Sequence, residues 1–147
     1  MGSKRLLAII LATLSSVALA APRFADYPAS SFSGRSANVR LVDPKSRQFA
    51  TMLRDASRRK PDFAGRYVLA SWGCGASCTM TAAIDAKTGA VSWLPFTLCC
   101  WRADIVEPLE FRLDSRLLIV QGSRNEQGSG THYYTFDGRR FSEVRAP

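Results

Sequence analysis

Four cysteines carry the chemistry that is easiest to recognise in this 147-residue sequence: Cys74, Cys78, Cys99 and Cys100. A thioredoxin-type redox site needs Cys-x-x-Cys at the start of a helix. Here the spacing is Cys-Gly-Ala-Ser-Cys, and it lies between two predicted strands. A zinc site is disfavoured because adjacent ligands such as Cys99 and Cys100 fit a tetrahedron badly. Structural disulfides are the expectation, and no metal or cofactor is predicted.

The pairing of these cysteines is constrained by backbone geometry. Adjacent Cα atoms lie ~3.8 Å apart across a trans peptide, below the roughly 4.4–6.8 Å of most disulfides, which disfavours a Cys99–Cys100 bond. Crossed arrangements also close longer loops, which favours them entropically. We therefore expect the Cys74–Cys78 loop to be tied to the Cys99–Cys100 corner. The alternatives are a Cys74–Cys78 bond, alone or with a vicinal bond, and free thiols.

Hydrolytic chemistry has a small set of candidate residues. His132 is the one histidine of the chain, so Ser–His–Asp or Cys–His catalysis would have to use it. Its predicted strand is rich in aromatic residues, a setting typical of a packed histidine. Glycan hydrolysis by paired carboxylates would use Glu107, Glu110 or Glu126, with Asp104 nearby. Arginines lie close to all of these in sequence, so ion pairing is the simpler interpretation.

Two polar surfaces are candidate binding sites. The loop from Gly122 to Thr131 is longer than a hairpin needs, and its candidate contact residues are Arg124, Asn125 and Glu126. A predicted helix carries Arg47, Arg54 and Arg58 opposite its apolar face, as a candidate anion-docking ridge. A solvated helix face is the alternative interpretation.

Three tryptophans, Trp72, Trp93 and Trp101, bracket the cysteines. Packed against a disulfide, such rings are ordinary core. Exposed beside the Gly-rich segment Gly73–Gly75, they would form a contact surface for a glycan or a protein.

One helix and a series of strands must position these residues. Asp43 and Pro44 are suited to the cap and first position of a helix that Pro61 ends. Its apolar face is formed by Phe49, Met52, Leu53 and Ala56. Apolar strand patterns follow over 66–72, 79–85, 90–94, 109–113, 116–121, 131–136 and 139–144, with a further short strand over 38–42. The predicted class is α+β: a disulfide-stabilised antiparallel β-meander of about six strands with one N-terminal amphipathic helix.

The N-terminus predicts export. Residues 1–20 combine Lys4 and Arg5, the apolar run Leu6–Leu14 and the small residues of Ala18-Leu19-Ala20, which is typical of a signal peptide cleaved near Ala20. Residues 21–37 lack periodicity and predict a flexible arm, and 38–147 a single β-rich globular domain. The apolar run is too short to span a bilayer, so the mature chain is predicted to have no transmembrane segment and to be periplasmic or secreted.

The charge balance narrows the class of partner. The formal net charge is +8 at pH 7. In the cytoplasm such an excess would suggest nucleic acid, but export makes an envelope protein or an anionic glycan the expected partner instead. An evenly spread solubility bias is the alternative.

The stretch Phe63–Ala70 running into Trp72-Gly73-Cys74-Gly75-Ala76-Ser77-Cys78 resembles a group of small exported bacterial proteins that carry a Trp-Gly-Cys-Gly-x-x-Cys motif. The resemblance covers roughly residues 63–121. It implies a bacterial envelope protein and brings no chemistry with it.

Taken together, these features favour a non-enzymatic envelope binding module, for example of the inhibitor or immunity type. A small hydrolase that uses acidic residues and His132, and a thiol-redox module built on Cys99 and Cys100, are the alternatives.

Overall fold

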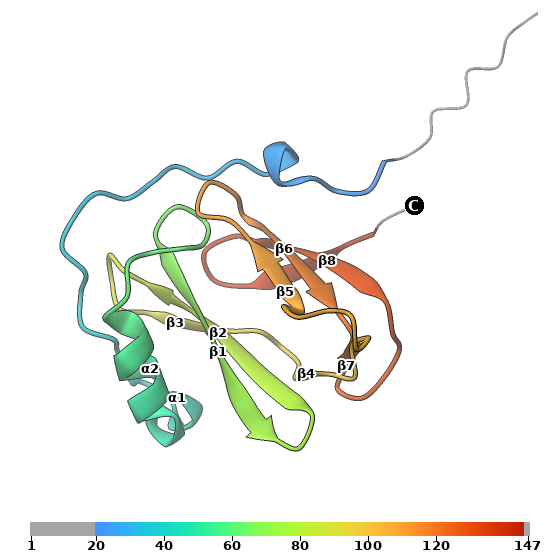
Figure 1. Cartoon of the computed structure of the whole chain (residues 1–147). Coiled ribbons are helices and arrows are strands. Elements are labelled where there is room, and N and C mark those ends of the chain that lie inside the picture. The colour runs from blue at the N-terminus through green and yellow to red at the C-terminus, as the bar shows by residue number, and fades with distance from the viewer. Residues whose placement is uncertain (1–19, 146–147) are drawn as a thin grey trace, which may run out of the picture.

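The apolar runs between Tyr67 and Val144 form two antiparallel sheets (Figure 1). The computed structural model describes residues 20–145, so the predicted signal sequence lies outside the described residues up to position 19. The first sheet has the order β1-β2-β4-β7, with β3 also paired to β2; its strands are β1 (Tyr67–Gly75), β2 (Cys78–Asp85), β3 (Val91–Trp93), β4 (Leu98–Cys99) and β7 (Ser123–Arg124). The second has the order β5-β6-β8-β9, with β5 (Leu109–Phe111), β6 (Leu117–Gln121), β8 (Thr131–Phe136) and β9 (Phe141–Val144).

The main core lies between these two sheets. Tyr67 and Leu69 of β1 meet Leu118 and Val120 of β6 and Phe136 of β8 there. The Phe136 ring contacts the ring of Tyr67 edge-on, with 4.8 Å between the centroids. Alternate residues of β1 point to the opposite face, so its first four residues, 67–70, are buried on both sides of the sheet, as the apolar pattern of this stretch predicts.

Helices cover the other face of the first sheet. The helical segments are α1 (Pro44–Gln48) and α2 (Ala50–Ser57), separated at Phe49. Leu53 of α2 is fully buried and packs in a second core with Val68 and Ala70 of β1. The molecule therefore has a helical layer, the first sheet and the second sheet, in that order.

The predicted start of the helix is confirmed, whereas its continuity is not. The Asp43 side chain accepts a hydrogen bond from the Ser46 backbone N–H at 2.8 Å, as an N-cap residue does. At Phe49 the backbone leaves helical geometry, and its ring packs against Trp72 and Trp93 with centroids 5.5 and 6.0 Å away. Two short helices thus replace the single predicted one.

The N-terminal segment, predicted as a flexible arm, is held against the body by backbone hydrogen bonds. It contains a short 3-10 helix, η1 (Phe24–Asp26), and then crosses the top of the molecule to reach α1 (Figure 1). Ala29 N–H donates to Asp114 O and Phe32 N–H to Gly65 O, both at 2.8 Å. Gly65 has a φ of +82°, and a Cβ there would overlap the Ser30 carbonyl oxygen. The glycine therefore permits the close approach that docks the arm.

The predicted single meander is corrected to two sheets and nine strands within residues 20–145. The hairpins are confirmed: β2 pairs with β3, β5 with β6 and β8 with β9. The chain passes to the second sheet after β4, and β7 returns to the first sheet by pairing with β4. The segment 38–42 forms no strand; Arg40 N–H donates to Gly89 O at 2.7 Å, and no strand partner continues the pairing.

Candidate functional site

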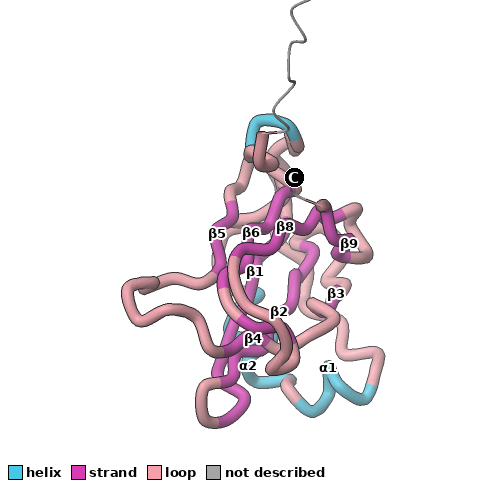
Figure 2. The backbone as a smooth tube through the Cα atoms, turned by 90° about the vertical axis from the view of Figure 1, so that its right-hand side faces the viewer, coloured by secondary structure: helices cyan, strands magenta, loops and turns pink. Residues whose placement is uncertain are grey.

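A groove with a volume of about 600 Å³ runs along the free edge of β1. One wall is α2, with Met52, Asp55 and Ala56. The opposite wall is β5 and the segment that joins β4 to β5, with Trp101, Glu107, Leu109 and Phe111. Figure 2 shows that joining segment projecting beyond the two sheets. The floor is formed by Leu69, Ser71 and Gly73.

Part of the β1 edge is capped from within the chain. Tyr67 exchanges backbone hydrogen bonds with Phe63, at 2.8 and 2.9 Å. At Leu69, side chains replace the missing strand: Leu69 N–H donates to Asp62 Oδ1 and Arg59 Nη2 donates to Leu69 O, each at 2.8 Å. The residues after α2 therefore provide hydrogen-bond partners for the outward backbone groups of β1 up to Leu69.

Beyond Leu69 the edge is open. In an antiparallel pair the outward-pointing N–H and C=O groups recur at every second residue. Because those of Leu69 point away from β2, those of Ser71 and Gly73 do so as well. No other described segment donates to or accepts from their backbone groups, and both residues are exposed. The groove therefore holds two residues of β1, Ser71 and Gly73, whose outward backbone groups are unpaired.

The walls of the groove are largely apolar. Met52 is 49% exposed, and Trp72, Trp101 and Phe111 are half-buried. Val106, next to the groove residue Glu107, is 86% exposed. Exposed apolar side chains gathered at one cleft are typical of an interaction surface.

The charges at the rim differ in how far they are paired. Asp55 accepts from Arg58 at 3.2 Å, and Arg59 lies 3.7 Å from Asp62. Burial raises the pKa of Asp62, while the Leu69 N–H and the charge of Arg59 act against this increase. Glu107 is exposed and forms no ion pair or side-chain hydrogen bond with any residue in the range 20–145. It is the groove's one unpaired charge among the described residues that line it.

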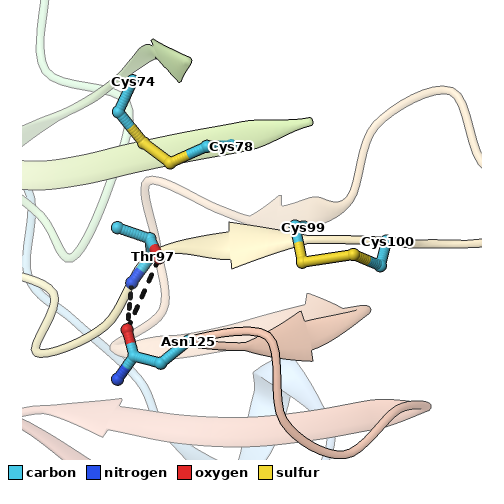
Figure 3. The surroundings of a disulfide bond; sticks show 6 residues. All are labelled: Cys74, Cys78, Thr97, Cys99, Cys100 and Asn125. Atoms are coloured by element: carbon cyan, nitrogen blue, oxygen red, sulfur yellow. Dashed lines mark hydrogen bonds between the residues drawn. A yellow bond between two sulfur atoms is a disulfide. The ribbon is translucent and has the colours of Figure 1, made fainter. Parts of the chain in front are cut away.

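Both disulfides lie beside the groove, and their pairing corrects the prediction. Cys74 bonds Cys78, and Cys99 bonds Cys100 (Figure 3). The crossed arrangement fails because the β1–β2 turn already brings Cys74 and Cys78 within 5.1 Å, Cα to Cα, inside the usual range. Cys99 and Cys100, 3.8 Å apart, pair where β4 ends and Cys100 adopts a φ of +58°. The entropic argument for crossed pairing concerns the unfolded chain. In the folded protein the hairpin determines which sulfur atoms lie close enough to bond.

The tryptophans divide between the two predicted roles. Trp72 and Trp101 line the groove. Trp93 packs edge-on against Trp72 with 5.7 Å between centroids, and Lys45 Nζ lies 4.2 Å from the centre of the Trp93 ring. Only the groove pair is placed for contact with a ligand.

The predicted contact loop is held mainly by its own side chains. Arg124 donates to Tyr134 OH and to Glu143 Oε1, both at 2.6 Å. Asn125 Oδ1 accepts from the Thr97 backbone N–H at 2.9 Å (Figure 3). Glu126 is exposed. Of the three predicted contact residues, only Glu126 has its side chain without an internal partner in the described structure.

The arginine ridge is divided by the helix break. Arg47 in α1 donates to Val42 O at 2.8 Å, and Arg58 pairs with Asp55. Arg54 in α2 is exposed and forms no ion pair within the described chain. Anion docking at these residues stays a prediction.

Two of the candidate hydrolase residues contact side chains outside the predicted catalytic set. His132 Nδ1 lies 3.9 Å from Glu143 Oε1, and Glu110 accepts from Gln121 Nε2 at 2.8 Å. Within residues 20–145 no ion pair joins His132 to Glu107, Glu110 or Glu126, and Asp104 pairs with Arg102.

The groove was not predicted from the sequence, because its edge and walls come from segments far apart in the chain. The exposed Val106 beside Glu107 was its one local signal.

Comparison with family models, with curated proteins and with solved structures gives no match to this chain. The described residues contain no cluster of His, Cys, Asp and Glu able to hold a metal ion. Every helix within 20–145 is too short or too polar to span a bilayer. The paired cysteines are compatible with export.

Proposed function

We propose that this protein is an exported, non-enzymatic binding module of the bacterial envelope, and that it holds a partner protein in the groove between α2 and the segment joining β4 to β5. An inhibitor or immunity-type module for an envelope hydrolase is the concrete form of this proposal. The signal-like N-terminus and the Trp-Gly-Cys-Gly-x-x-Cys motif support its place in the envelope.

The observation that carries the proposal is the exposed apolar surface in and beside the groove. Met52 exposes apolar surface on the α2 wall, Trp101 and Phe111 line the opposite wall, and Val106 is exposed next to the groove residue Glu107. Burying such side chains stabilises a complex by roughly 25 cal/mol for each Å² removed from water. A cleft with these side chains at its rim favours a protein partner over a glycan.

The surroundings of the groove are rigid, which favours binding. The Cys74–Cys78 bond fixes the end of the β1–β2 hairpin, and Arg59 and Asp62 hold the edge of β1. A site that is already ordered loses little conformational entropy when a partner binds.

A charge placed on the groove wall tests the proposal. Met52→Glu puts a carboxylate on the α2 wall, where a bound partner would desolvate it. Val42→Glu is the matched control, because Val42 is 67% exposed and lies outside the groove. Tagged wild type and both variants are exposed to envelope extract, and recovery of a stoichiometric partner is quantified by mass spectrometry.

We expect recovery of the same partner with wild type and Val42→Glu, and a loss of tenfold or more with Met52→Glu, about 1.4 kcal/mol. Equal recovery with Met52→Glu would show that the partner does not use the groove. Hydrolysis of an envelope substrate that disappears in His132→Ala would favour the enzymatic alternative.

A further inference from the structure

We propose that the groove takes an extended polypeptide segment as an additional strand of the first sheet, paired with β1 at Ser71 and Gly73. This inference rests on the proposed function and names the form of the partner: an extended segment with alternating apolar side chains and a basic residue. Strand addition supplies affinity through main-chain hydrogen bonds and specificity through alternate side chains.

The unpaired backbone groups carry this inference. Tyr67 and Leu69 point their edge groups at partners within the chain, the 62–63 backbone and the side chains of Asp62 and Arg59. Ser71 and Gly73 continue the same outward series with no internal partner among the described residues. The internal cap thus ends within the groove, at Leu69, and an incoming strand would continue it.

The layers of the fold give the added strand two apolar walls. The first sheet lies between α2 and the second sheet, so its next strand position is the space beside β1. Side chains of an added strand would point alternately to each layer. One set meets Met52 and Trp72, and the other meets Trp101 and Phe111.

Charge complementarity specifies one side chain of the occupant. Asp55 and Arg59 are engaged with Arg58 and Asp62, which leaves Glu107 as the unpaired charge described above. A Lys or Arg of the added strand would pair with it. An ion pair at such a rim contributes more to selectivity and association rate than to affinity.

A second copy of this chain fits the edge poorly. Edge-to-edge pairing of two β1 strands would bring a second α2 and a second β4–β5 segment against the walls of the first. A single extended segment has no such bulk. Dimer formation through β1 is therefore an outcome that overturns the inference.

A random peptide library displayed on phage is the probe. Peptides selected on wild-type protein are synthesised, and their dissociation constants are measured by fluorescence anisotropy. Gly73→Pro removes the outward N–H at the edge without removing a bond to β2, a position where proline is tolerated. Gly73→Ala is the control, because an added Cβ meets only Cys78 O at 3.8 Å and the N–H remains.

We expect Gly73→Pro to weaken binding about tenfold and Gly73→Ala to bind like wild type. Peptides N-methylated one residue at a time should lose affinity at every second position, since alternate N–H groups pair with β1. This scan uses the unaltered protein, so it holds even if Gly73→Pro fails to fold. Glu107→Gln should weaken binding of selected peptides that contain a basic residue.

The outcomes separate this inference from the proposed function. If peptides bind, Met52→Glu abolishes their binding and the N-methyl scan shows no period of two, strand addition is wrong although the groove still binds. If the library yields no groove-dependent peptide, or the chain dimerises through β1, strand addition is overturned whatever partner the envelope extract supplies. If peptides bind by strand addition but Met52→Glu recovers the envelope partner as well as wild type does, the proposed function is overturned instead.

Discussion

The side-chain cap on the β1 edge predicts a measurable difference between two substitutions of one residue. Asp62 Oδ1 accepts the Leu69 N–H at 2.8 Å, and Leu69 is 3% exposed. Asp62→Ala removes the acceptor and leaves a buried N–H without a partner. Asp62→Asn keeps an amide oxygen in the same position and removes only the charge.

The magnitudes follow from what each change leaves unsatisfied. A buried donor without a partner costs about 1–3 kcal/mol, so Asp62→Ala should lower the free energy of unfolding by about 2 kcal/mol. The ion pair with Arg59 adds little, because the Arg59 side chain is 50% exposed and 3.7 Å from the carboxylate. Asp62→Asn should therefore cost less than about 1 kcal/mol.

The dependence on pH has a definite sign. Burial raises the pKa of Asp62 above its ordinary value of 3.8, so the folded protein binds this proton more tightly than the unfolded chain does. The free energy of unfolding must then fall as pH rises from 3.8 through the raised pKa, and level off above it. Asp62→Asn lacks this proton. The stability of wild type relative to Asp62→Asn should fall over that window.

Urea unfolding followed by tryptophan fluorescence between about pH 4 and pH 7 measures both effects. The other carboxylates titrate in both proteins, so their contributions cancel in the difference. Equal destabilisation by Asp62→Asn and Asp62→Ala would refute the role of the hydrogen bond. A wild-type advantage over Asp62→Asn that grows with pH would refute the account of the raised pKa.

Three further changes have expected outcomes in the same unfolding assay. Leu53→Ala should cost about 2–5 kcal/mol because Leu53 is fully buried between α2 and β1; a cost below about 1 kcal/mol would contradict that packing. Replacing Cys74 and Cys78 together by alanine should cost roughly 2 kcal/mol, the chain-entropy value for so short a loop, and an unchanged midpoint would show that the bond does not form. Arg124→Ala should cost about 1 kcal/mol or more through its bonds to β8 and β9, whereas Glu126→Ala should change stability by less than about 0.5 kcal/mol; equal effects would show that Arg124 does not anchor the loop.

Local signals in the sequence predicted the hairpins well. The β2–β3 turn at Asp85–Gly89 and the β8–β9 turn at Asp137–Gly138 join strands that are close in sequence, so residue pattern and turn chemistry together specify the pairing. The helix start at Asp43 is of the same kind, since its cap bonds a residue only three positions away.

The separation into two sheets had no such local signal. Ser123 and Arg124 of β7 pair with β4 and not with their neighbours in sequence. The pairing depends on Pro95 and the residues after it, which carry the chain from β3 to β4 along one edge of β2. Neither segment shows a strand pattern long enough to indicate where it pairs.

The amino-acid sequence by itself determined the predominance of strands, the hairpins, the capped start of the helix and a signal-like N-terminus, because each is specified by residues within one or two turns of chain. The tertiary structure alone decided the pairing of β7 with β4 and the groove. Those features depend on the separation of atoms from distant segments: Asp62 and Arg59 meet Leu69, and Met52 faces Trp101 across the open edge at Ser71 and Gly73. A pattern in sequence records which side chains seek burial, whereas only the packed layers determine which backbone groups are left without a partner.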